Sequence, residues 1–379
     1  MVQKDFKKSK NIDIIKGIGI ILVVLGHAYF PLRKYIYLFH VAVFFMTAGY
    51  CNNEKYSSSL LSFIELFIKR VKSLWVPYMI YNLIFLLFQN ILIKFHIYTD
   101  DYQSLSMGFL SNDGFISIIG MKDAIVIIMK SVFFINSRPL LGGLWFLGGL
   151  FYVTILYNLI DLILVKLKIK KLHIIISIVL LLIGFFISKG TISIPFFGKF
   201  ISIVFSCEIL FLVGVVLKDH MSKIMNKPLL ILVLSCSILI ILSHFGSISI
   251  GSTHFVNPLF FLSASVVGFV FLWSLSIFIL RVELLEKVFI YIGVNTIPIL
   301  ALHILSFKII TLIQMHVFNE SALVISALPV WKFDSYWWLL YSIVGVSLPL
   351  FINKIFTRIR NYVFFLGKNL RMKITSLKR

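Results

Sequence analysis

Long apolar runs recur along the whole chain and are separated by short polar strips. The hydrocarbon core of a bilayer is roughly 30 Å thick and needs about 20 apolar residues in a spanning helix, so each run predicts one transmembrane helix. The sequence therefore predicts an all-α fold, a polytopic transmembrane helical bundle of about ten spans that forms a single domain over residues 1–379. The predicted spans are 12–30, 35–52, 73–93, 143–165, 172–188, 200–217, 228–244, 257–280, 288–315 and 335–353.

One further apolar stretch, 115–136, is interrupted by Lys122, Asp123 and Lys130 and leaves no clean span. We predict that this stretch is interfacial or re-entrant. It belongs to the predicted outer loop 94–142, the one long connection on that side. A loop of this length is a candidate cover for a functional site.

The composition excludes other classes of protein. Hydrophobic residues make up 60% of the chain and charged residues 13%, whereas soluble domains are roughly 45–50% apolar and about 25% charged. A soluble enzyme with a single anchor is therefore excluded. The three cysteines, Cys51, Cys207 and Cys236, lack metal-ligand spacing, so we expect neither a disulfide framework nor a metal site.

The charge distribution predicts the topology. The net charge is +21, from 36 Lys and Arg against 15 Asp and Glu. The basic residues lie in strips between apolar runs, which indicates membrane topology and not a nucleic-acid partner. With the N-terminus in the cytoplasm, most basic residues fall on the inner side, so we predict that both termini are cytoplasmic, with basic tails at 1–11 and 354–379. The expected location is the bacterial cytoplasmic membrane, with membrane lipids as partners.

The first predicted helix contains three ionisable residues, Asp13, Lys16 and His27. At about 100° per residue, the step from Lys16 to His27 is three turns plus roughly 20°, which puts both on one face. Asp13 lies roughly 40° from the same stripe. Lys16 and His27 are then roughly 16 Å apart along the axis. The stripe either follows a reaction path or consists of side chains that snorkel to the headgroups.

Other polar groups fall within or beside predicted spans. His40 is expected at a depth similar to His27, either for proton transfer or as a packed, hydrogen-bonded side chain. Lys69 and Arg70, at an inner helix end, either follow the positive-inside rule or bind phosphates. Four further residues are candidates to line a pocket, because they are polar or aromatic groups inside apolar runs: Trp145, Glu208, Asn295 and His303.

Five blocks in this order, DIIKGIGIILVVLGH, FHVAVFFMTAGY, RVKSLWVPY, LWFLGGLF and IGVNTIPILALH, resemble the acyltransferase 3 family of membrane O-acyltransferases, most of all its fucose-4-O-acetylase-like branch. The resemblance implies that acetyl-CoA from the cytoplasm donates its acyl group to a hydroxyl of a cell-surface or exported glycan. The family pattern of an Arg, ten residues and a His falls on Lys16 and His27. Lys keeps the charge but loses the bidentate fork of Arg. The arginines that the family's motifs carry near the third helix correspond to Arg70 and Lys69 of this sequence.

The resemblance and the helix geometry together predict a mechanism. The phosphates of acetyl-CoA bind Lys16, Lys69 and Arg70, and His27 is the general base that takes the proton of the acceptor hydroxyl. Asp13 orients the first helix, whereas His40, Asn295 and His303 remain alternatives for polarising the thioester carbonyl.

Two other functions remain open. The alternative is a transporter or flippase of a glycan or lipid-linked intermediate that uses Lys16, Glu208 and Lys308 as intramembrane charges. The other is a structural subunit among glycan-assembly proteins.

Overall fold

The computed structural model describes residues 2–100, 116, 118–135, 138–195, 197–332 and 334–377, with side chains described from residue 10 to residue 362. Almost all regular structure is helical. The α-helices are α1 (Val2–His27), α2 (Arg33–Ile36), α3 (Ala42–Tyr50), α4 (Leu60–Arg70), α5 (Val76–Leu87), α6 (Gln89–Lys94), α8 (Met121–Val132), α9 (Trp145–Lys166), α10 (His173–Ser188), α11 (Gly198–Ile224), α12 (Pro228–Phe245), α13 (Pro258–Ile279), α14 (Glu283–Val294), α15 (Thr296–Val317) and α16 (Trp337–Leu377).

Shorter elements connect these helices. Strands β1 (Ile248–Ser249) and β2 (His254–Phe255) form an antiparallel pair around the 3₁₀ turn η6 (Ile250–Ser252). The π turn η2 (Val71–Trp75) joins α4 to α5. The remaining short helices are η1 (Glu54–Ser57), η4 (Pro139–Leu144), η5 (Lys170–Leu172) and η7 (Ala322–Ser326).

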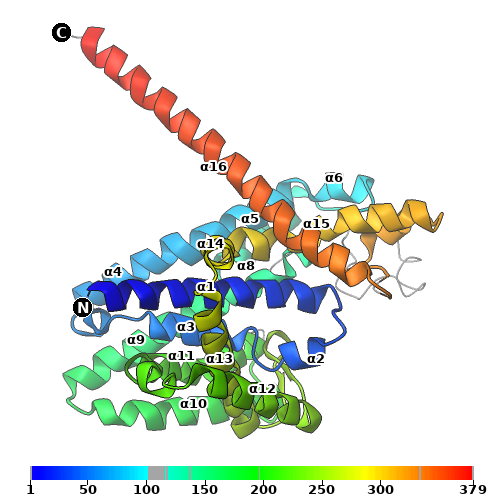
Figure 1. Cartoon of the computed structure of the whole chain (residues 1–379). Helices are drawn as coiled ribbons and strands as arrows, with labels where there is room; N and C mark the ends of the chain where they lie inside the picture. Colours follow the sequence, from blue (N-terminus) through cyan, green and yellow to red (C-terminus); the bar gives the residue numbers. More distant parts are fainter. Residues whose placement is uncertain are drawn as a thin grey trace.

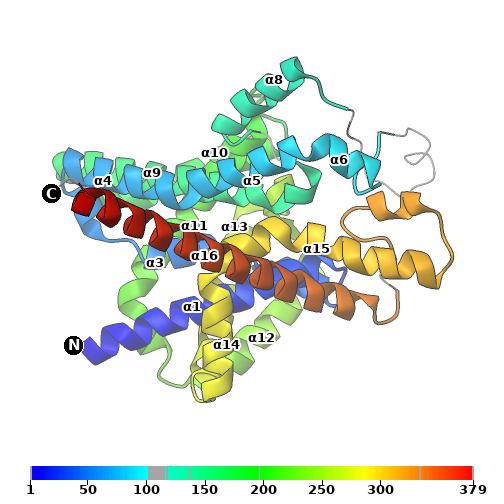
Figure 2. The same cartoon turned by 90° about the horizontal axis from the view of Figure 1, so that it is seen from above.

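Helix α1 occupies the middle of the bundle. In Figure 1 it runs between an upper group that contains α4, α5, α15 and α16 and a lower group that contains α9 to α13. The view from above shows the helices of the α4 and α5 segment beside α9, with α1 and α15 across the centre (Figure 2). The residues of α1 contact α14, α13, α15, α16 and α3, and none of its described side chains is exposed.

Within the described residues, seven helices are long and apolar enough to cross a membrane. The share of each apolar window that is buried runs from 61% in α11 to 11% in α12. A helix that exposes nearly all of an apolar window needs an apolar solvent, so α12 is suited to contact with lipid. The chain is therefore a multi-pass membrane protein of mainly helical structure. These seven candidate spans, which do not confirm the predicted count of about ten, are Pro139–Lys166, Lys170–Ser188, Gly198–Ile224, Pro228–Phe245, Pro258–Ile279, Thr296–Val317 and Trp337–Tyr362.

Two predicted spans are wrong as continuous helices. The window 35–52 contains a turn and then the nine-residue α3. The window 288–315 contains α14 and α15, with a break at Asn295. Pro298 explains the second break, because its ring clashes with the carbonyl four residues earlier, at Val294, and a helix tolerates proline only in its first turn.

Two other predicted boundaries differ because the helix continues beyond its most apolar window. The window 73–93 belongs to a helical segment that begins at Leu60 and passes through η2. The window 335–353 is the start of α16, which continues to Leu377. A hydropathy window detects the part of a helix that lies in lipid, whereas the backbone hydrogen bonds continue into polar sequence.

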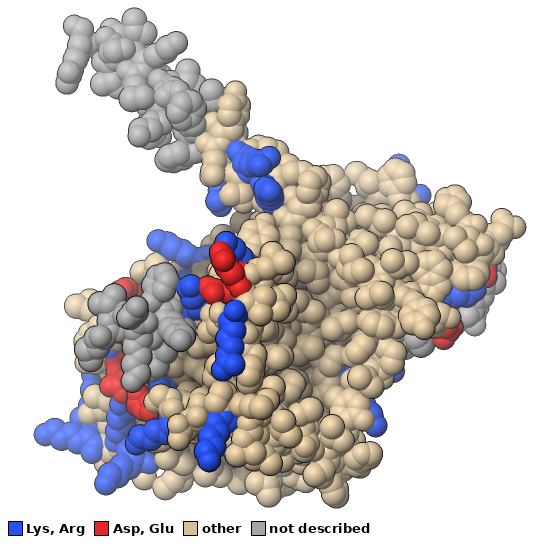
Figure 3. Space-filling model, in the orientation of Figure 1, with Lys and Arg blue, Asp and Glu red and all other residues tan. Residues whose placement is uncertain are grey.

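The basic side chains gather on one part of the visible surface. In Figure 3 most Lys and Arg atoms lie on the left, the side of the N-terminus and of the start of α4, and the rest of this face is largely uncharged.

The segment predicted to be interfacial or re-entrant contains α8, whose 12 residues are fewer than a span requires. Residues 101–115, in the predicted outer loop, lie outside the described residues.

The crossing of α3 and α11 depends on two glycines. A Cβ atom on Gly49 would lie 2.0 Å from the Phe211 carbonyl oxygen, and one on Gly214 would lie 2.1 Å from the Met46 carbonyl oxygen. Backbone atoms cannot move aside as a flexible side chain does. Small residues at such crossings let two membrane helices approach closely.

We expect Gly214→Leu to separate α3 from α11 and to lower the free energy of unfolding by about 1–3 kcal/mol or more. The measurement is thermal unfolding of the purified protein in detergent. Gly120→Ala is the control, because a Cβ there approaches only the Asp123 carboxylate, at 3.9 Å. An unchanged Tm for Gly214→Leu would contradict the close crossing.

Candidate active site

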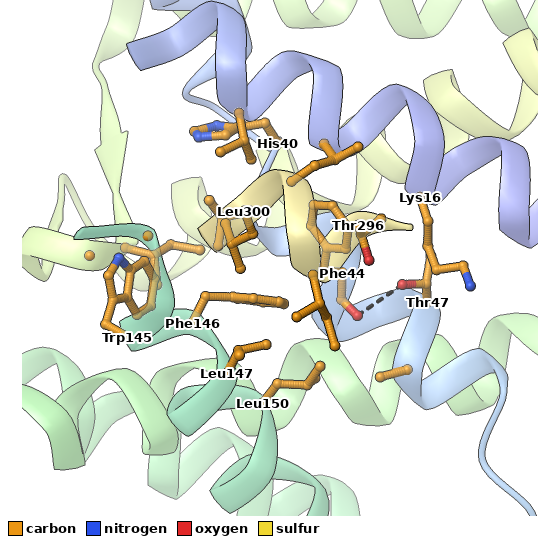
Figure 4. A pocket seen from close by; sticks show the side chains of 18 of the residues that line it. Lys16, His40, Phe44, Thr47, Trp145, Phe146, Leu147, Leu150, Thr296 and Leu300 are labelled. Atoms are coloured by element: carbon orange, nitrogen blue, oxygen red, sulfur yellow. Dashed lines mark hydrogen bonds between the residues drawn. The ribbon is translucent and has the colours of Figure 1, made fainter. Parts of the chain in front are cut away.

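A cavity of about 480 Å³ lies beside α1 and is enclosed by α3, the α4 to α5 segment, η6 and the starts of α9 and α15. We call it the first cavity. Figure 4 shows Lys16 and Thr47 at one end and His40 and Trp145 at the other, with Phe44, Phe146, Leu147 and Leu150 between them. The Thr47 hydroxyl donates to the Phe44 carbonyl, 2.9 Å away, so its hydrogen is not available to a ligand. The two polar ends are thus joined by an apolar passage.

One face of α1 forms a long wall of this cavity. Its lining residues, Ile12, Lys16, Ile20, Val23 and His27, recur at steps of three or four, which is the spacing of one helical face. Lys16 and His27 therefore lie on the same wall, roughly 16 Å apart along the axis.

Asp13 does not line the cavity. Its carboxylate lies 2.6 Å from the Lys16 ammonium, three residues later on α1, and both side chains are partly buried. This i,i+3 ion pair fixes the position of the ammonium near the basic end of α1. The contact orients a side chain at the basic end, far from His27.

Three histidines from separate segments lie at the other end. The rings of His27 and His303 are 5.1 Å apart between centroids and are inclined by 48°. The Nδ1 atom of His40 lies 2.9 Å from the Ile36 carbonyl, and that of His303 lies 3.0 Å from the carbonyls of Ile299 and Leu300. A neutral imidazole that donates from Nδ1 has an acceptor lone pair on Nε2. In His303 this Nε2 is buried and has no hydrogen-bond partner.

The basic end of the cavity contains Arg70, the last residue of α4, where the backbone enters the π turn η2. Pro77 accounts for the local widening, because it cannot donate to the carbonyl of Ser73. The buried Nε of Arg70 has no hydrogen-bond partner. Lys69 is exposed, donates to the Tyr56 hydroxyl at 3.3 Å and does not line the cavity. Arg70 and Lys16 thus line one cavity, whereas Lys69 lies outside it.

A second cavity of about 620 Å³ meets the first. The two share His27 and Trp145 together with Gly251 and Ser252 of the β1–β2 hairpin. A Cβ atom on Gly251 would lie 2.9 Å from the Trp145 indole, so the hairpin backbone packs directly on that ring. The second cavity also contains Arg138 and Lys199. His27 therefore lies where two separate cavities adjoin, which the sequence pattern alone did not predict.

Two predicted pocket residues lie elsewhere. The Glu208 carboxylate is 3.1 Å from Nε2 of His173, whose Nδ1 is 3.5 Å from Asp161, in a buried cluster between α9, α10 and α11. Asn295 is half-buried at the break between α14 and α15, where it accepts from Asn353 at 2.8 Å. Of the four predicted pocket residues, Trp145 lines both cavities, and His303 contacts His27 without lining either cavity. Glu208 and Asn295 line neither.

The sequence analysis missed the partners that stabilise the intramembrane charges. His173 begins an apolar helix, and Asp161 lies one turn before the end of another, so a search for ionisable groups in apolar runs would have found them. Lys308 is buried and donates to the Ala327 carbonyl. Within the described part of the chain, no group of three or more His, Cys, Asp or Glu side chains is placed to hold a metal ion.

The fold and the cavities define a class: a multi-pass membrane protein with a ligand passage inside its helical bundle. The family model of the acyltransferase domain Acyl_transf_3 matches residues 9–352, from α1 into α16, and the chain belongs to this family. It is thus a membrane acyltransferase. No curated protein and no solved structure matches the chain.

Proposed function

We propose that this protein is a membrane O-acetyltransferase of the fucose-4-O-acetylase-like branch, which moves an acetyl group from cytoplasmic acetyl-CoA to a hydroxyl of a cell-surface or exported glycan. The observation that carries the proposal is the position of His27, which lines both cavities. A group that touches two passages can act on a donor that enters through one and an acceptor that enters through the other.

The first cavity suits the donor. Arg70 and Lys16 lie at its basic end, and no Asp or Glu is among the described residues that line it. The phosphates of coenzyme A bind at this end by charge-assisted hydrogen bonds. The pantetheine arm is a flexible, uncharged chain, and its methylene and methyl groups can pack against the walls formed by Phe44, Phe146 and Leu150. The thioester then reaches the histidines.

The chemistry at that end is a general-base acyl transfer. His27 takes the proton of the acceptor hydroxyl as its oxygen attacks the thioester carbonyl carbon. Collapse of the tetrahedral intermediate breaks the C–S bond, and the protonated imidazole returns the proton to the thiolate of coenzyme A. His303 and His40, each with Nδ1 bound to a backbone carbonyl, have their Nε2 atoms left to orient His27 or to polarise the carbonyl. The apolar walls limit hydrolysis by excluding water.

Two of the three intramembrane charges that a transporter would use, Glu208 and Lys308, favour acyl transfer over transport, whereas the third, Lys16, lines the first cavity. Glu208 and Lys308 lie outside both cavities, and each has a partner in the fold, His173 and the Ala327 carbonyl. A translocation pathway would place such charges where the cargo passes. Neither Glu208 nor Lys308 lies along either cavity.

The test is a sidedness assay in sealed membrane vesicles of both orientations, with radiolabelled acetyl-CoA on one side and bacterial polysaccharide on the other. We expect label in the polysaccharide when acetyl-CoA is on the side of Lys16 and Arg70, and background levels in the reverse arrangement. Transfer only when donor and acceptor share one side would contradict the two-cavity route. Movement of glycan in the absence of acetyl-CoA would support a flippase.

A further inference from the structure

The second cavity contains two cationic side chains, Arg138 and Lys199. No Asp or Glu is among the described residues that line it. None of the ion pairs formed within the described part of the chain includes either cation. Two cations in the lining, with no carboxylate among its described residues, give an electrostatic potential that favours an anion.

Arg138 is the more informative of the two, because a buried cation without a partner is costly. Only 8% of the residue is exposed, and its buried Nη2 has no hydrogen-bond partner. The neighbouring Tyr98 does not neutralise it, because burial raises the pKa of that phenol above its ordinary value and keeps it uncharged. Donors that the fold leaves unpaired are available to a ligand.

The backbone around Arg138 is set by the sequence. Arg138 precedes Pro139, and a residue before proline is held in an extended conformation, as here with φ −69° and ψ 150°. The 3₁₀ turn η4 then leads to Trp145, whose indole lines the same cavity. The guanidinium and the aromatic ring are therefore carried by one short, constrained segment.

We propose that the acceptor bound in the second cavity is an acidic glycan, one whose sugar next to the reacting hydroxyl carries a carboxylate or a phosphate that pairs with Arg138 and Lys199. This inference rests on the proposed function, since it names the acceptor class of the same site. The volume of about 620 Å³ is within the roughly 300–1,000 Å³ of ligand pockets. His27 borders the same space, so a sugar held by its anionic group presents a neighbouring hydroxyl to the base.

The first experiment measures binding without chemistry, using the full chain in lipid nanodiscs. The probes are methyl β-glucuronoside, glucose 6-phosphate and the neutral methyl β-glucoside. We expect the acidic probes to bind at least tenfold more tightly than the neutral one, and Arg138→Gln to remove about tenfold to a hundredfold of that affinity. The probe that binds more tightly identifies carboxylate or phosphate as the anionic group. Equal binding of neutral and acidic probes by the wild type would overturn the inference.

Matched variants separate recognition from folding. Lys199→Gln, at an exposed position in the same cavity, tests the same anion site if Arg138→Gln fails to fold, and we expect a loss of several fold. The controls are Lys189→Gln and Arg33→Gln, two exposed basic residues that do not line either cavity. A purely structural role for Arg138 would change the affinities for acidic and neutral probes alike, and that result would also overturn the inference.

Acetyl transfer to the same probes distinguishes the two proposals. A higher KM for the acidic acceptor in Arg138→Gln, with the KM for acetyl-CoA unchanged, would support both. Selective binding of acidic probes with no transfer to any glycan would keep the anion site and contradict the acetyltransferase. Transfer that is equal for neutral and acidic acceptors would keep the acetyltransferase and contradict the anion site.

Discussion

Replacing His27 by Gln is expected to lower kcat/KM for acetyl transfer by about 10²–10⁴-fold, the usual contribution of a general base. Glutamine keeps a polar side chain of similar reach but cannot accept the hydroxyl proton. Because the effect is on the chemical step, kcat falls and the KM for acetyl-CoA changes little. The measurement is transfer of labelled acetyl groups from acetyl-CoA to polysaccharide in membranes that contain equal amounts of each variant.

The control for this prediction is His244→Gln, an exposed histidine at the end of α12 that lies outside both cavities. It removes an imidazole from the same protein without touching the site. Equal labelling by wild type and His27→Gln would eliminate His27 as the base. His303→Gln then becomes the informative variant, because its unpartnered Nε2 is adjacent to His27.

Replacing Arg70 by Gln is expected to raise the KM for acetyl-CoA by about tenfold to a hundredfold, the loss of one or two charge-assisted hydrogen bonds to phosphate. The kcat should stay near the wild-type value, because Arg70 lies at the basic end of the first cavity and the chemistry takes place at the histidine end. Initial rates over a range of acetyl-CoA concentrations separate the two parameters.

Lys72→Gln is the matched control, two residues from Arg70, exposed and outside the cavity lining. It changes the net charge by the same amount, so a general surface-charge effect would appear in both variants. A kcat that falls with an unchanged KM in Arg70→Gln would contradict a role in donor binding. That outcome would assign the guanidinium to the structure of the π turn.

Sequence analysis predicted the parts of the site that lie on one regular element. Lys16 and His27 share a helix, so the angle per residue was enough to place them on one face. It failed where the chain is irregular or where partners come from distant segments. A continuous helix over 288–315 predicts that Asn295 and His303 line one cavity, but the chain breaks at Asn295. The predicted pocket residue Glu208 pairs instead with His173, which is remote in sequence.

The sequence by itself determined that this is a membrane protein of the helical class, because apolar runs of spanning length have no other stable environment. It also determined the order of the family blocks, and the family match over residues 9–352 agrees with them. Only the tertiary structure decided that His27 adjoins both His303 and a second, cationic cavity. The physical reason is that a local pattern sets which face of a helix is polar, whereas the packing of α1 against other helices and the β1–β2 hairpin sets what that face meets.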